Sequence, residues 1–318
     1  MNNIIAGKNN SGQRIDKFLK EEIFFNGNTT RGEIVRNIKE GNVLVNKKTV
    51  KPSYILKGGD KVETNIPEKI IKLRSNEKIK FKIIFEDKNF VVINKPAGLT
   101  VHPSSAERKD TLASGLLAKF PEIENVGDAP EVRPGIVHRL DKDTSGIMIA
   151  ARNRKTFLEL KNKFKRREVK KTYWAVVHGN LGEPGSSGII DKPIARSADY
   201  KKQTVAGTKT KTKIREAVTE YKIIKKFADY SLVEVSPKTG RMHQIRVHLK
   251  SIGHPIVGDK IYKLKRYSGA NDAGRQLLHA KELSFNLFGK KYYFETDVSG
   301  DMKKFLDSLT NAGNEDRI

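Results

Sequence analysis

The sequence predicts an α+β protein, in which a mixed, mainly antiparallel sheet carries flanking helices and follows a small N-terminal α/β domain. Short apolar runs of strand length dominate from residue 81 onward. Amphipathic helical segments fall between only some of these runs, which favours α+β over regularly alternating strands and helices. The chain has 318 residues, which suggests about two domains, and its 37% hydrophobic content is enough to fill their cores.

The N-terminal domain is expected to span residues 1–66. A first helical pattern of apolar residues is followed by a second that begins near Thr30, which forms a capping-box pattern with Glu33. Gly41 ends this second helix, and short strands separated by turn residues follow. The charged, aperiodic stretch 67–80 is interpreted as a linker.

The main domain is expected to span residues 81–310, before a frayed tail at 311–318. Its predicted helices have apolar residues three and four positions apart, at 111–120, 154–166, 241–252 and 302–309. Its predicted strands are short and rich in β-branched and aromatic residues, at 81–85, 90–94, 135–138, 146–151, 173–178, 219–224, 232–235, 277–285 and 291–297. The polar, basic segment 189–216 is expected to form an exposed hairpin or arm.

The net charge of the chain indicates which class of molecule it binds. The chain has 62 Lys and Arg against 37 Asp and Glu, a net charge of +25. Such an excess produces a positive surface field that is typical of nucleic-acid binding, with acidic membranes as the second candidate. In the N-terminal domain we expect Arg14, Arg31 and Arg36 to contact RNA phosphates.

Composition also excludes several classes. The absence of cysteine excludes disulfides, Cys-ligated zinc, iron–sulfur clusters and a thiol nucleophile, and makes the cytoplasm the default location. No stretch approaches the roughly 20 apolar residues that a membrane span requires. The first residues have no apolar core of signal-peptide length.

The densest polar cluster lies at residues 138–146, between two predicted strands. A loop held between core strands can position a reactive group accurately. Asp141 is the candidate group, because the nearby cation Arg139 favours an ionised carboxylate, which can act as a nucleophile or base in a partly dry pocket. The alternative is an ordinary turn, in which Asp and Ser side chains cap backbone amides.

Rival chemistries fit this sequence poorly. Residues 143–146 faintly resemble an aspartic-protease loop, but the chain has no second copy to supply the paired carboxylate, which argues against an acid hydrolase. Ser145 lacks the Gly-x-Ser-x-Gly elbow of a serine hydrolase. His243 and His248 are five residues apart, about 140° around a helix, so they cannot share one face as a zinc pair, and we expect no metal.

A second polar cluster occupies residues 239–248. Arg241, His243 and Gln244 gather at the predicted helix start, where backbone amides attract anions such as phosphate. Arg246 lies at the edge of the buried face and therefore needs a carboxylate or an anionic ligand. We expect Asp141 to be its partner, and the alternative is an ordinary structural ion pair.

A third candidate is the aromatic pair Tyr173 and Trp174. Strand alternation places these side chains on opposite faces of the sheet. Tyr173 facing a pocket could stack on a base or use its hydroxyl in acid–base chemistry, whereas the alternative is a core tyrosine.

Together these segments resemble the RluA family of pseudouridine synthases, and the whole chain is most similar to the RluD branch. The matching motifs are Asn94-Lys95-Pro96-Ala97-Gly98-Leu99-x-Val101-His102-Pro103, His138-Arg139-Leu140-Asp141-x-x-Thr144-Ser145-Gly146, Lys171-x-Tyr173-x-Ala175, Thr219-Glu220-Tyr221, Gly240-Arg241-x-His243-Gln244-Ile245-Arg246-Val247-His248, His254-Pro255-Ile256-Val257-Gly258-Asp259 and Leu278-His279-Ala280. Residues 1–66 resemble the small RNA-binding domain of ribosomal protein S-four. One departure is the stretch 263–267, because a Gly commonly follows the residue that matches Tyr262, and this concerns local substrate contacts.

The resemblance implies that the chain isomerises uridine in RNA to pseudouridine. The base is cut from its sugar at nitrogen 1, turned, and rejoined through carbon 5, so no cofactor is required. Asp141 would act at the glycosidic bond, Arg246 would hold it ionised and aimed, and Tyr173 would stack against the flipped base. Leu140 and Ile245 would shape an apolar pocket that excludes water.

The resemblance also implies how RNA is held. The target base must leave its stack, at a cost of a few kcal/mol. Arg139 would fill the vacated space, with His138 beside it. The implied partner is RNA, most specifically large-subunit ribosomal RNA, and we expect a cytoplasmic monomer that binds no membrane.

Two other functions are compatible with the scaffold. One is a non-catalytic RNA-binding or ribosome-assembly protein, against which the presence of Asp141, Tyr173 and Arg246 argues. The other is a synthase specific for transfer RNA.

Overall fold

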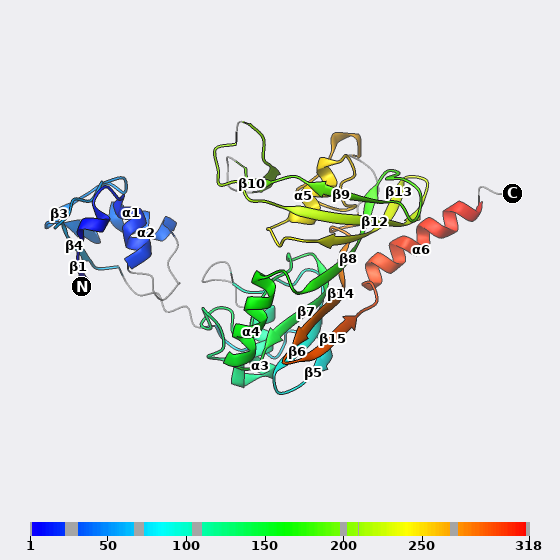
Figure 1. Cartoon of the computed structure of the whole chain (residues 1–318), viewed down its shortest axis with the longest axis horizontal. Coiled ribbons are helices and arrows are strands. Elements are labelled where there is room, and N and C mark those ends of the chain that lie inside the picture. The colour runs from blue at the N-terminus through cyan, green and yellow to red at the C-terminus, as the bar shows by residue number, and fades with distance from the viewer. Residues whose placement is uncertain are drawn as a thin grey trace. The chain divides into compact units, whose positions relative to one another are not determined.

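The computed structural model describes residues 2–22, 31–66, 73–103, 110–197, 202–208, 210–267 and 273–315. The chain forms two compact units, Met1–Lys72 (the N-terminal unit) and Leu73–Ile318 (the C-terminal unit). Figure 1 shows the N-terminal unit in blue and the C-terminal unit in the remaining colours. Each unit has its own hydrophobic core.

The N-terminal unit packs two helices on a small antiparallel sheet. The helices are α1 (Ile15–Glu22) and α2 (Arg31–Lys39), and the sheet has the order β1-β4-β2-β3. The strands are β1 (Asn2–Ile5), β2 (Val43–Val45), β3 (Lys48–Thr49) and β4 (Lys61–Thr64). The core is formed by the apolar faces of both helices and by alternate strand residues, namely Ile15, Phe18, Leu19, Ile34, Ile38, Val43, Val45 and Val62. The predicted small α/β domain is confirmed, whereas Thr30, the expected start of the second helix, lies outside the described residues.

The predicted linker at 67–80 is wrong for its second half. Residues 67–72 lie outside the described residues, but residues 73–80 belong to the C-terminal unit. Leu73 is buried, and its N–H donates to the carbonyl of Glu131 (2.7 Å). The N–H of Asn76 likewise donates to the carbonyl of Ser114 (3.0 Å). Backbone hydrogen bonds of this kind hold an aperiodic segment in place without leaving any hydrophobic pattern in the sequence.

The C-terminal unit is built on a nine-stranded sheet with the order β5-β6-β7-β14-β8-β13-β12-β9, and β15 pairs with β14. Its strands are β5 (Lys82–Glu86), β6 (Phe90–Lys95), β7 (Ser145–Ala151), β8 (Lys170–His178), β9 (Ser187–Asp191), β12 (Val218–Lys226), β13 (Tyr230–Pro237), β14 (Leu278–Leu287) and β15 (Lys290–Glu295). The described pairings are antiparallel except that of β7 with β14, which is parallel. The predicted mixed, mainly antiparallel sheet is therefore confirmed.

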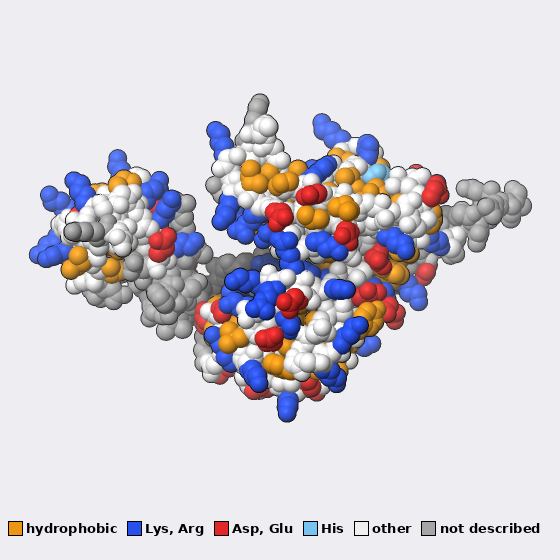
Figure 2. All heavy atoms as spheres, viewed as in Figure 1, with side chains coloured by type: hydrophobic (Ala, Val, Ile, Leu, Met, Phe, Trp, Pro, Cys, Tyr) orange, Lys and Arg blue, Asp and Glu red, His pale blue; other side chains and the backbone are white. Residues whose placement is uncertain are grey.

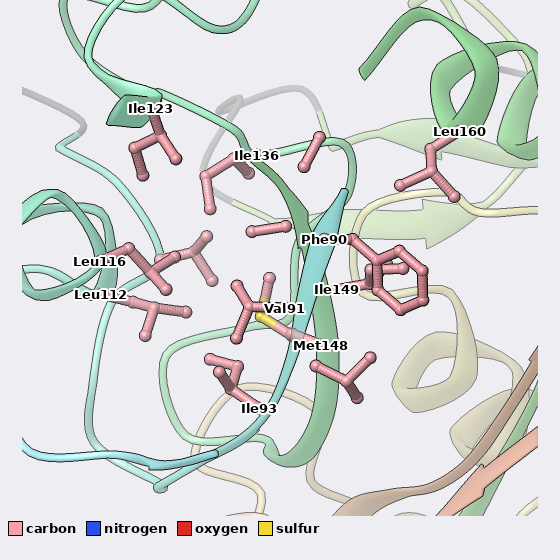
Figure 3. Close-up of a cluster of buried hydrophobic side chains, with 14 of the residues drawn as sticks. Phe90, Val91, Ile93, Leu112, Leu116, Ile123, Ile136, Met148, Ile149 and Leu160 are labelled. Atoms are coloured by element: carbon pink, nitrogen blue, oxygen red, sulfur yellow. The ribbon is translucent and has the colours of Figure 1, made fainter. Parts of the chain in front are cut away.

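Helices cover both faces of the β6–β7 half of the sheet. They are α3 (Leu112–Lys119), which starts with the side-chain cap of Thr111, and α4 (Arg154–Lys165), which starts with that of Asn153. Figure 3 shows Leu112 and Leu116 on one side of the strands, and Leu160 on the other side beside Phe90. These residues belong to one buried cluster, which makes this half of the sheet a rigid support.

Two further helices cover the other half of the sheet. Ala175 and Val177 of β8 share a cluster with α5 (Gln244–Ser251), whereas Val176 shares one with Met302 of α6 (Gly300–Glu315). Trp174 packs in the same cluster as Val176, so Tyr173 and Trp174 do face opposite sides of the sheet. The expected arm contains a separate two-stranded pair, β10 (Ile194–Arg196) and β11 (Gln203–Val205).

Two predicted helix limits are wrong. The helix expected from residue 241 begins at Gln244, because His243 adopts a left-handed conformation (φ 57°) that a helix interior excludes. The tail expected to fray from residue 311 is helical up to Glu315. Helix extension adds one backbone hydrogen bond per residue, so a formed helix can continue through weak helix formers such as Asn and Gly. Residues 316–318 lie outside the described part.

Gly146 makes the parallel contact between β7 and β14 possible. A Cβ atom at this position would lie 2.2 Å from the carbonyl oxygen of Ala280, and its φ of +112° is a conformation that side-chain-bearing residues rarely adopt. Since Gly146 also pairs with Lys95 of β6, the two strands beside the polar loop meet at this glycine.

We expect Gly146→Ala to lower the free energy of unfolding by about 3 kcal/mol or more, because overpacking and backbone strain add. Urea denaturation followed by the fluorescence of Trp174, the single tryptophan, measures this in the C-terminal unit. Gly207→Ala is the matched control, since a Cβ there meets open space. Equal stability of the two variants would contradict this account of the strand contact.

Candidate active site

The loop that carries Asp141 is anchored by a buried lysine. Lys95, at the end of β6, is fully buried, and its Nζ donates to the carbonyl oxygens of Pro96 (2.8 Å), Leu99 (2.9 Å) and Lys142 (2.9 Å). Burial lowers the pKa of Lys95 to about 7, while its three acceptors match the three N–H groups of the protonated amine. Lys95 therefore ties the residue after Asp141 to the neighbouring strand.

A buried arginine anchors the same loop from the other side. Nη1 of Arg275 donates to the carbonyl of Asp143 (2.9 Å), and its Nε and Nη2 donate to the carboxylate of Asp301 (2.6 and 2.8 Å). Asp301 is the second residue of α6, and its hydrogen bonds with Arg275 lower the pKa of its carboxyl group. Neither anchor was predicted from the sequence, although Lys95 lies within a matching motif.

Asp141 and Arg246 meet as predicted. Nη1 of Arg246 donates to Oδ2 of Asp141 (2.9 Å). The sequence analysis missed a second carboxylate, that of Asp259, which accepts from Nε (2.7 Å) and Nη2 (2.9 Å) of the same guanidinium. In the sequence, only the family motif that ends at Asp259 pointed to this residue. Arg246 thus binds one carboxylate in a fork through Nε and Nη2, which form one edge of the guanidinium, and orients the other carboxylate through Nη1.

The three charged side chains of Arg246, Asp259 and Asp141 are buried to different extents. The side chains of Arg246 and Asp259 are 5% and 1% exposed, whereas that of Asp141 is 21% exposed. Burial by itself lowers the pKa of Arg246, but the hydrogen bonds and charge of Asp259, and then those of Asp141, raise it overall. Burial raises the pKa of Asp259, but Arg246 and the N–H groups of Tyr262 and Ile261 lower it overall. Asp259 and Arg246 are therefore the inner pair, and Asp141 is the member that solvent reaches.

His243 stands beside the same carboxylate. Its Nε2 lies 3.8 Å from Oδ1 of Asp141, and its Nδ1 lies 2.8 Å from the hydroxyl of Tyr262. Burial lowers the pKa of His243, and the positive charges of Arg246 and Arg139 act in the same direction, although Asp141 and Asp259 oppose them. His243 was predicted to bind RNA, and the structure places it in the wall beside Asp141.

Tyr173 lies on β8, which β14 separates from β7 in the sheet. It pairs with Ala280 of β14, which in turn pairs with Gly146 of β7. Burial, and then the charge of Asp141, raises the pKa of the Tyr173 phenol, so the hydroxyl remains protonated at neutral pH. The structure thus brings Asp141 and Arg246 into contact and places Tyr173 within the electrostatic influence of Asp141. The stacking role of Tyr173 remains a prediction.

The residues around Asp141 differ in exposure. Arg139 is exposed, and its predicted insertion into RNA remains a prediction. His138 stacks on Phe164 (ring centroids 4.6 Å apart), and its Nε2 accepts from the N–H of Ile149 (3.0 Å), so one ring nitrogen already has a protein partner. Leu140 and Ile245 are 5% and 7% exposed, so most of each side chain belongs to the cores.

The RNA-binding role predicted for Gln244 is wrong. Gln244 is buried, and its amide oxygen accepts from the hydroxyl of Thr239 and the N–H of Arg241, while its amide nitrogen donates to Val218 and Thr219. Its polar atoms are occupied in holding the start of α5, which the polarity of Gln alone could not reveal.

Three of the remaining predicted RNA contacts, Arg241, Arg36 and Arg14, lie at least partly at the surface. Arg241 is partly exposed, and its Nε donates to the carbonyl of Glu216 (3.0 Å). In the N-terminal unit Arg36 is exposed on α2, and Arg14 is partly exposed in an ion pair with Asp16 (3.0 Å). Arg31 begins α2, but its side chain lies outside the described part.

Two other possibilities receive no support within the described residues. In that part of the chain no group of three or more His, Cys, Asp and Glu side chains is placed to hold a metal ion. None of the described helices has the length and apolar character needed to cross a membrane.

Comparison with known families agrees with this geometry. Residues 89–251 match the family model of RNA pseudouridylate synthases, and residues 13–62 match that of the S4 domain. The chain is 36% identical over 312 residues to an uncharacterised RNA pseudouridine synthase, YlyB, of Bacillus subtilis, and the match covers 98% of both chains.

Other relatives carry more specific names. The ribosomal large subunit pseudouridine synthase D of Xanthomonas campestris is 35% identical, with 94% of this chain and 89% of that protein covered. Among solved structures, the chain is similar to the one titled "Human RNA Pseudouridylate Synthase Domain Containing 4", with a TM-score of 0.57 and 27% identity. The match covers 72% of this chain and 93% of that chain. The chain belongs to the RNA pseudouridine synthase family, as an isomerase with an N-terminal S4 RNA-binding domain.

We expect Asp259→Asn to destabilise the C-terminal unit by about 3 kcal/mol, because it leaves the buried charge of Arg246 half neutralised. Turnover should fall as well, since Arg246 would no longer be held against Asp141. Denaturation and single-turnover assays measure the two effects. Asp301→Asn is the matched control, because Asp301 binds Arg275 in a similar fork but its carboxylate is 48% exposed. Its loss of stability should therefore be smaller. Equal losses would contradict the importance of burial at Asp259.

Acid should destabilise the C-terminal unit through its neutral histidines. Burial lowers the pKa of His138 to about 3 and those of His102 and His279 to about 4. In the unfolded chain these groups titrate near 6.5, so below that pH the unfolded state binds more protons and the free energy of unfolding falls. The slope should approach roughly 1.4 kcal/mol per pH unit for each histidine.

Urea denaturation between pH 7 and pH 5 tests this dependence. In His138→Gln the amide oxygen can still accept from the N–H of Ile149. This variant should lower the pH slope of the free energy of unfolding by the contribution of about one proton. A free energy of unfolding that does not change over this range would refute the neutral state of these histidines.

Proposed function

We propose that this chain converts uridines in large-subunit ribosomal RNA to pseudouridine, with Asp141 as the catalytic carboxylate. One observation carries the proposal. Oδ2 of Asp141 is fixed by Arg246, whereas Oδ1 has no hydrogen-bond donor within bonding distance among the described residues. The carboxylate is thus held in one orientation, is partly open to solvent, and keeps one oxygen available for a substrate.

The surroundings suit cleavage and rejoining of a glycosidic bond. The reaction adds and removes no atoms overall, so the residues must hold one charged group, one base and one sugar in register. The inner pair of Arg246 and Asp259 supplies a rigid support for Asp141. The partly buried ring of Tyr173 and the small exposed parts of Leu140 and Ile245 would provide an apolar wall for the uracil.

The target nucleotide must leave its stack to reach Asp141, and the basic surface helps to offset that cost. Figure 2 shows Lys and Arg side chains gathered along the hollow of the C-terminal unit between the β10–β12 region and the α4 region. Arg139 is exposed in the loop that carries Asp141, in a position to occupy the space that the flipped base leaves.

The N-terminal unit offers a separate surface for RNA. A groove of ≈ 970 Å³ runs between α2 and residues 49–53, and Arg14, Lys39 and Lys51 contribute to its lining. The carboxylate of Asp16 in this groove is fully buried beside Arg14, unlike the partly exposed carboxylate of Asp141, so we assign the groove to binding and not to the reaction. The S4 match to residues 13–62 supports this role.

The choice of ribosomal RNA rests on the relatives. Three relatives named ribosomal large subunit pseudouridine synthase D, each 34–36% identical, align with 76–94% of this chain. The two relatives that align with 94% of the chain are similar over both the S4 segment and the segment with Asp141 and Arg246, which supports a related substrate.

We expect Asp141→Asn to abolish pseudouridine formation while leaving RNA affinity within about threefold, because the amide keeps the volume but cannot carry the negative charge. Asp143→Asn, in the same loop but without a contact to Arg246, should keep most of its activity. Tritium release from labelled RNA measures turnover, and filter binding measures affinity. Near-normal turnover in Asp141→Asn would end the catalytic assignment.

Pseudouridine mapping of total RNA tests the substrate. Cells without the gene should lack modifications in large-subunit ribosomal RNA, and these should return with the wild-type gene but not with Asp141→Asn. Loss confined to transfer RNA would replace ribosomal RNA as the substrate while leaving the chemistry intact.

A further inference from the structure

A buried tyrosine connects the basic arm to the active site. Tyr262 is 2% exposed although Lys260, Ile261 and Lys263 around it are exposed. Its ring lies beneath the guanidinium of Arg246, 5.0 Å from the ring centroid, and its N–H donates to Asp259 (3.0 Å). The proposed catalytic role of Asp141 does not by itself require the hydroxyl of this residue.

The hydroxyl has two partners. It accepts from the backbone N–H of Gln203 in β11 (2.9 Å) and lies 2.8 Å from Nδ1 of His243. The N–H of Gln203 can only donate, so the hydroxyl must accept from it. The hydroxyl proton is then free to point at Nδ1 of His243.

Counting donors and acceptors fixes the histidine tautomer. If Nδ1 carried the proton, the Tyr262 hydroxyl would accept twice, and its own buried proton would have no acceptor among the described residues. A buried donor without a partner loses its hydrogen bond to water without replacement and is therefore unfavourable. The arrangement that satisfies all three groups runs from Gln203 N–H to the Tyr262 hydroxyl to Nδ1 of His243. The ring proton of neutral His243 therefore resides on Nε2.

This proton faces the reacting carboxylate. Nε2 of His243 lies 3.8 Å from Oδ1 of Asp141, the oxygen that Arg246 does not bind. The separation is too long for a hydrogen bond in the free protein, but contacts of this kind shorten when a substrate closes the site. Burial raises the pKa of Tyr262 to about 12, so its hydroxyl stays protonated and can act as the donor.

We propose that Tyr262 is a positioning residue that holds His243 in its Nε2–H tautomer, and that this N–H orients the free oxygen of Asp141. The proposal rests on the proposed role of Asp141. Because Gln203 belongs to β11, the same hydroxyl couples the β10–β11 arm to the carboxylate.

The backbone of His243 supports a dedicated role. Its φ of 57° lies in the left-handed region, which is uncommon for a residue with a side chain and which often occurs at functional sites. The charged groups that face the ring are Asp141, Arg139, Arg246 and Asp259. Burial and the two arginines favour the neutral ring that the proposal requires.

The first test is spectroscopic and needs no RNA. In full-length protein with ¹⁵N-labelled histidine, assigned by the signals lost in His243→Gln, we expect the shift of an unprotonated Nδ1 and a protonated Nε2 at neutral pH. Tyr262→Phe, which keeps the ring under Arg246 and removes only the hydroxyl, should produce a mixture of tautomers. Tyr230→Phe, whose ring packs against Phe305 away from this group, is the control and should leave the His243 signals unchanged.

The second test is kinetic. Tyr262→Phe should lower kcat about tenfold and leave the KM for RNA within about threefold, as expected for one lost hydrogen bond that acts in the reacting complex. His243→Gln can place an amide N–H near the Nε2 position and should retain more activity than His243→Asn. Asn adopts the left-handed conformation easily but is too short, so the comparison separates the lost donor from backbone strain.

The outcomes are decisive in either direction. A wild-type His243 protonated on Nδ1, or a Tyr262→Phe variant with unchanged tautomer and kcat, would overturn the proposal. Should Tyr262→Phe fail to fold, the wild-type spectrum and the order of the two His243 variants decide. Near-normal turnover in Asp141→Asn would instead refute the proposed function, and the tautomer measurement would still stand.

Discussion

The structure of the active site depends on one guanidinium, that of Arg246, held between two carboxylates. Taking a charge out of water is expensive, and only a well-formed fork with Asp259 makes the buried position of Arg246 tolerable. Once that fork exists, the Nη1 group of Arg246 is fixed in space and so is the oxygen of Asp141 that accepts from it. Asp141 can remain partly exposed because its support is buried.

The rest of the C-terminal unit serves to bring three distant segments to this point. The loop with Asp141 enters β7, the helix α5 carries Arg246, and the turn after Val257 carries Asp259. Lys95 and Arg275 bind the main-chain carbonyls of the two residues that follow Asp141, namely Lys142 and Asp143. Loops lack the ladder hydrogen bonds of a sheet, so buried cations take over that function here.

The protein separates binding from chemistry in space and in charge. Its excess of basic residues is distributed over the surface, where attraction to phosphates is long-ranged and insensitive to base sequence. The site around Arg246 holds two carboxylates, those of Asp141 and Asp259, within this basic chain. In the proposed function a flipped base, which is neutral, would enter this site while the phosphates stay on the basic surface.

The sequence by itself determined the fold class and the need of Arg246 for an anionic partner, for which Asp141 was the expected candidate. The fold class could be read because strand and helix periodicities are local, and the ion pair because an Arg at the edge of an apolar helix face must find an anion. Motif resemblance located Tyr173, His243 and Asp259 but could not say what each touches.

Only the tertiary structure decided that Gln244 is a buried helix support, that residues 73–80 join the core, and that Asp259 is the inner partner of Arg246. The physical reason is the same in each case. Polarity and charge are properties of a residue, but burial and hydrogen-bond partners are properties of the packed chain, set by segments that lie far away in sequence.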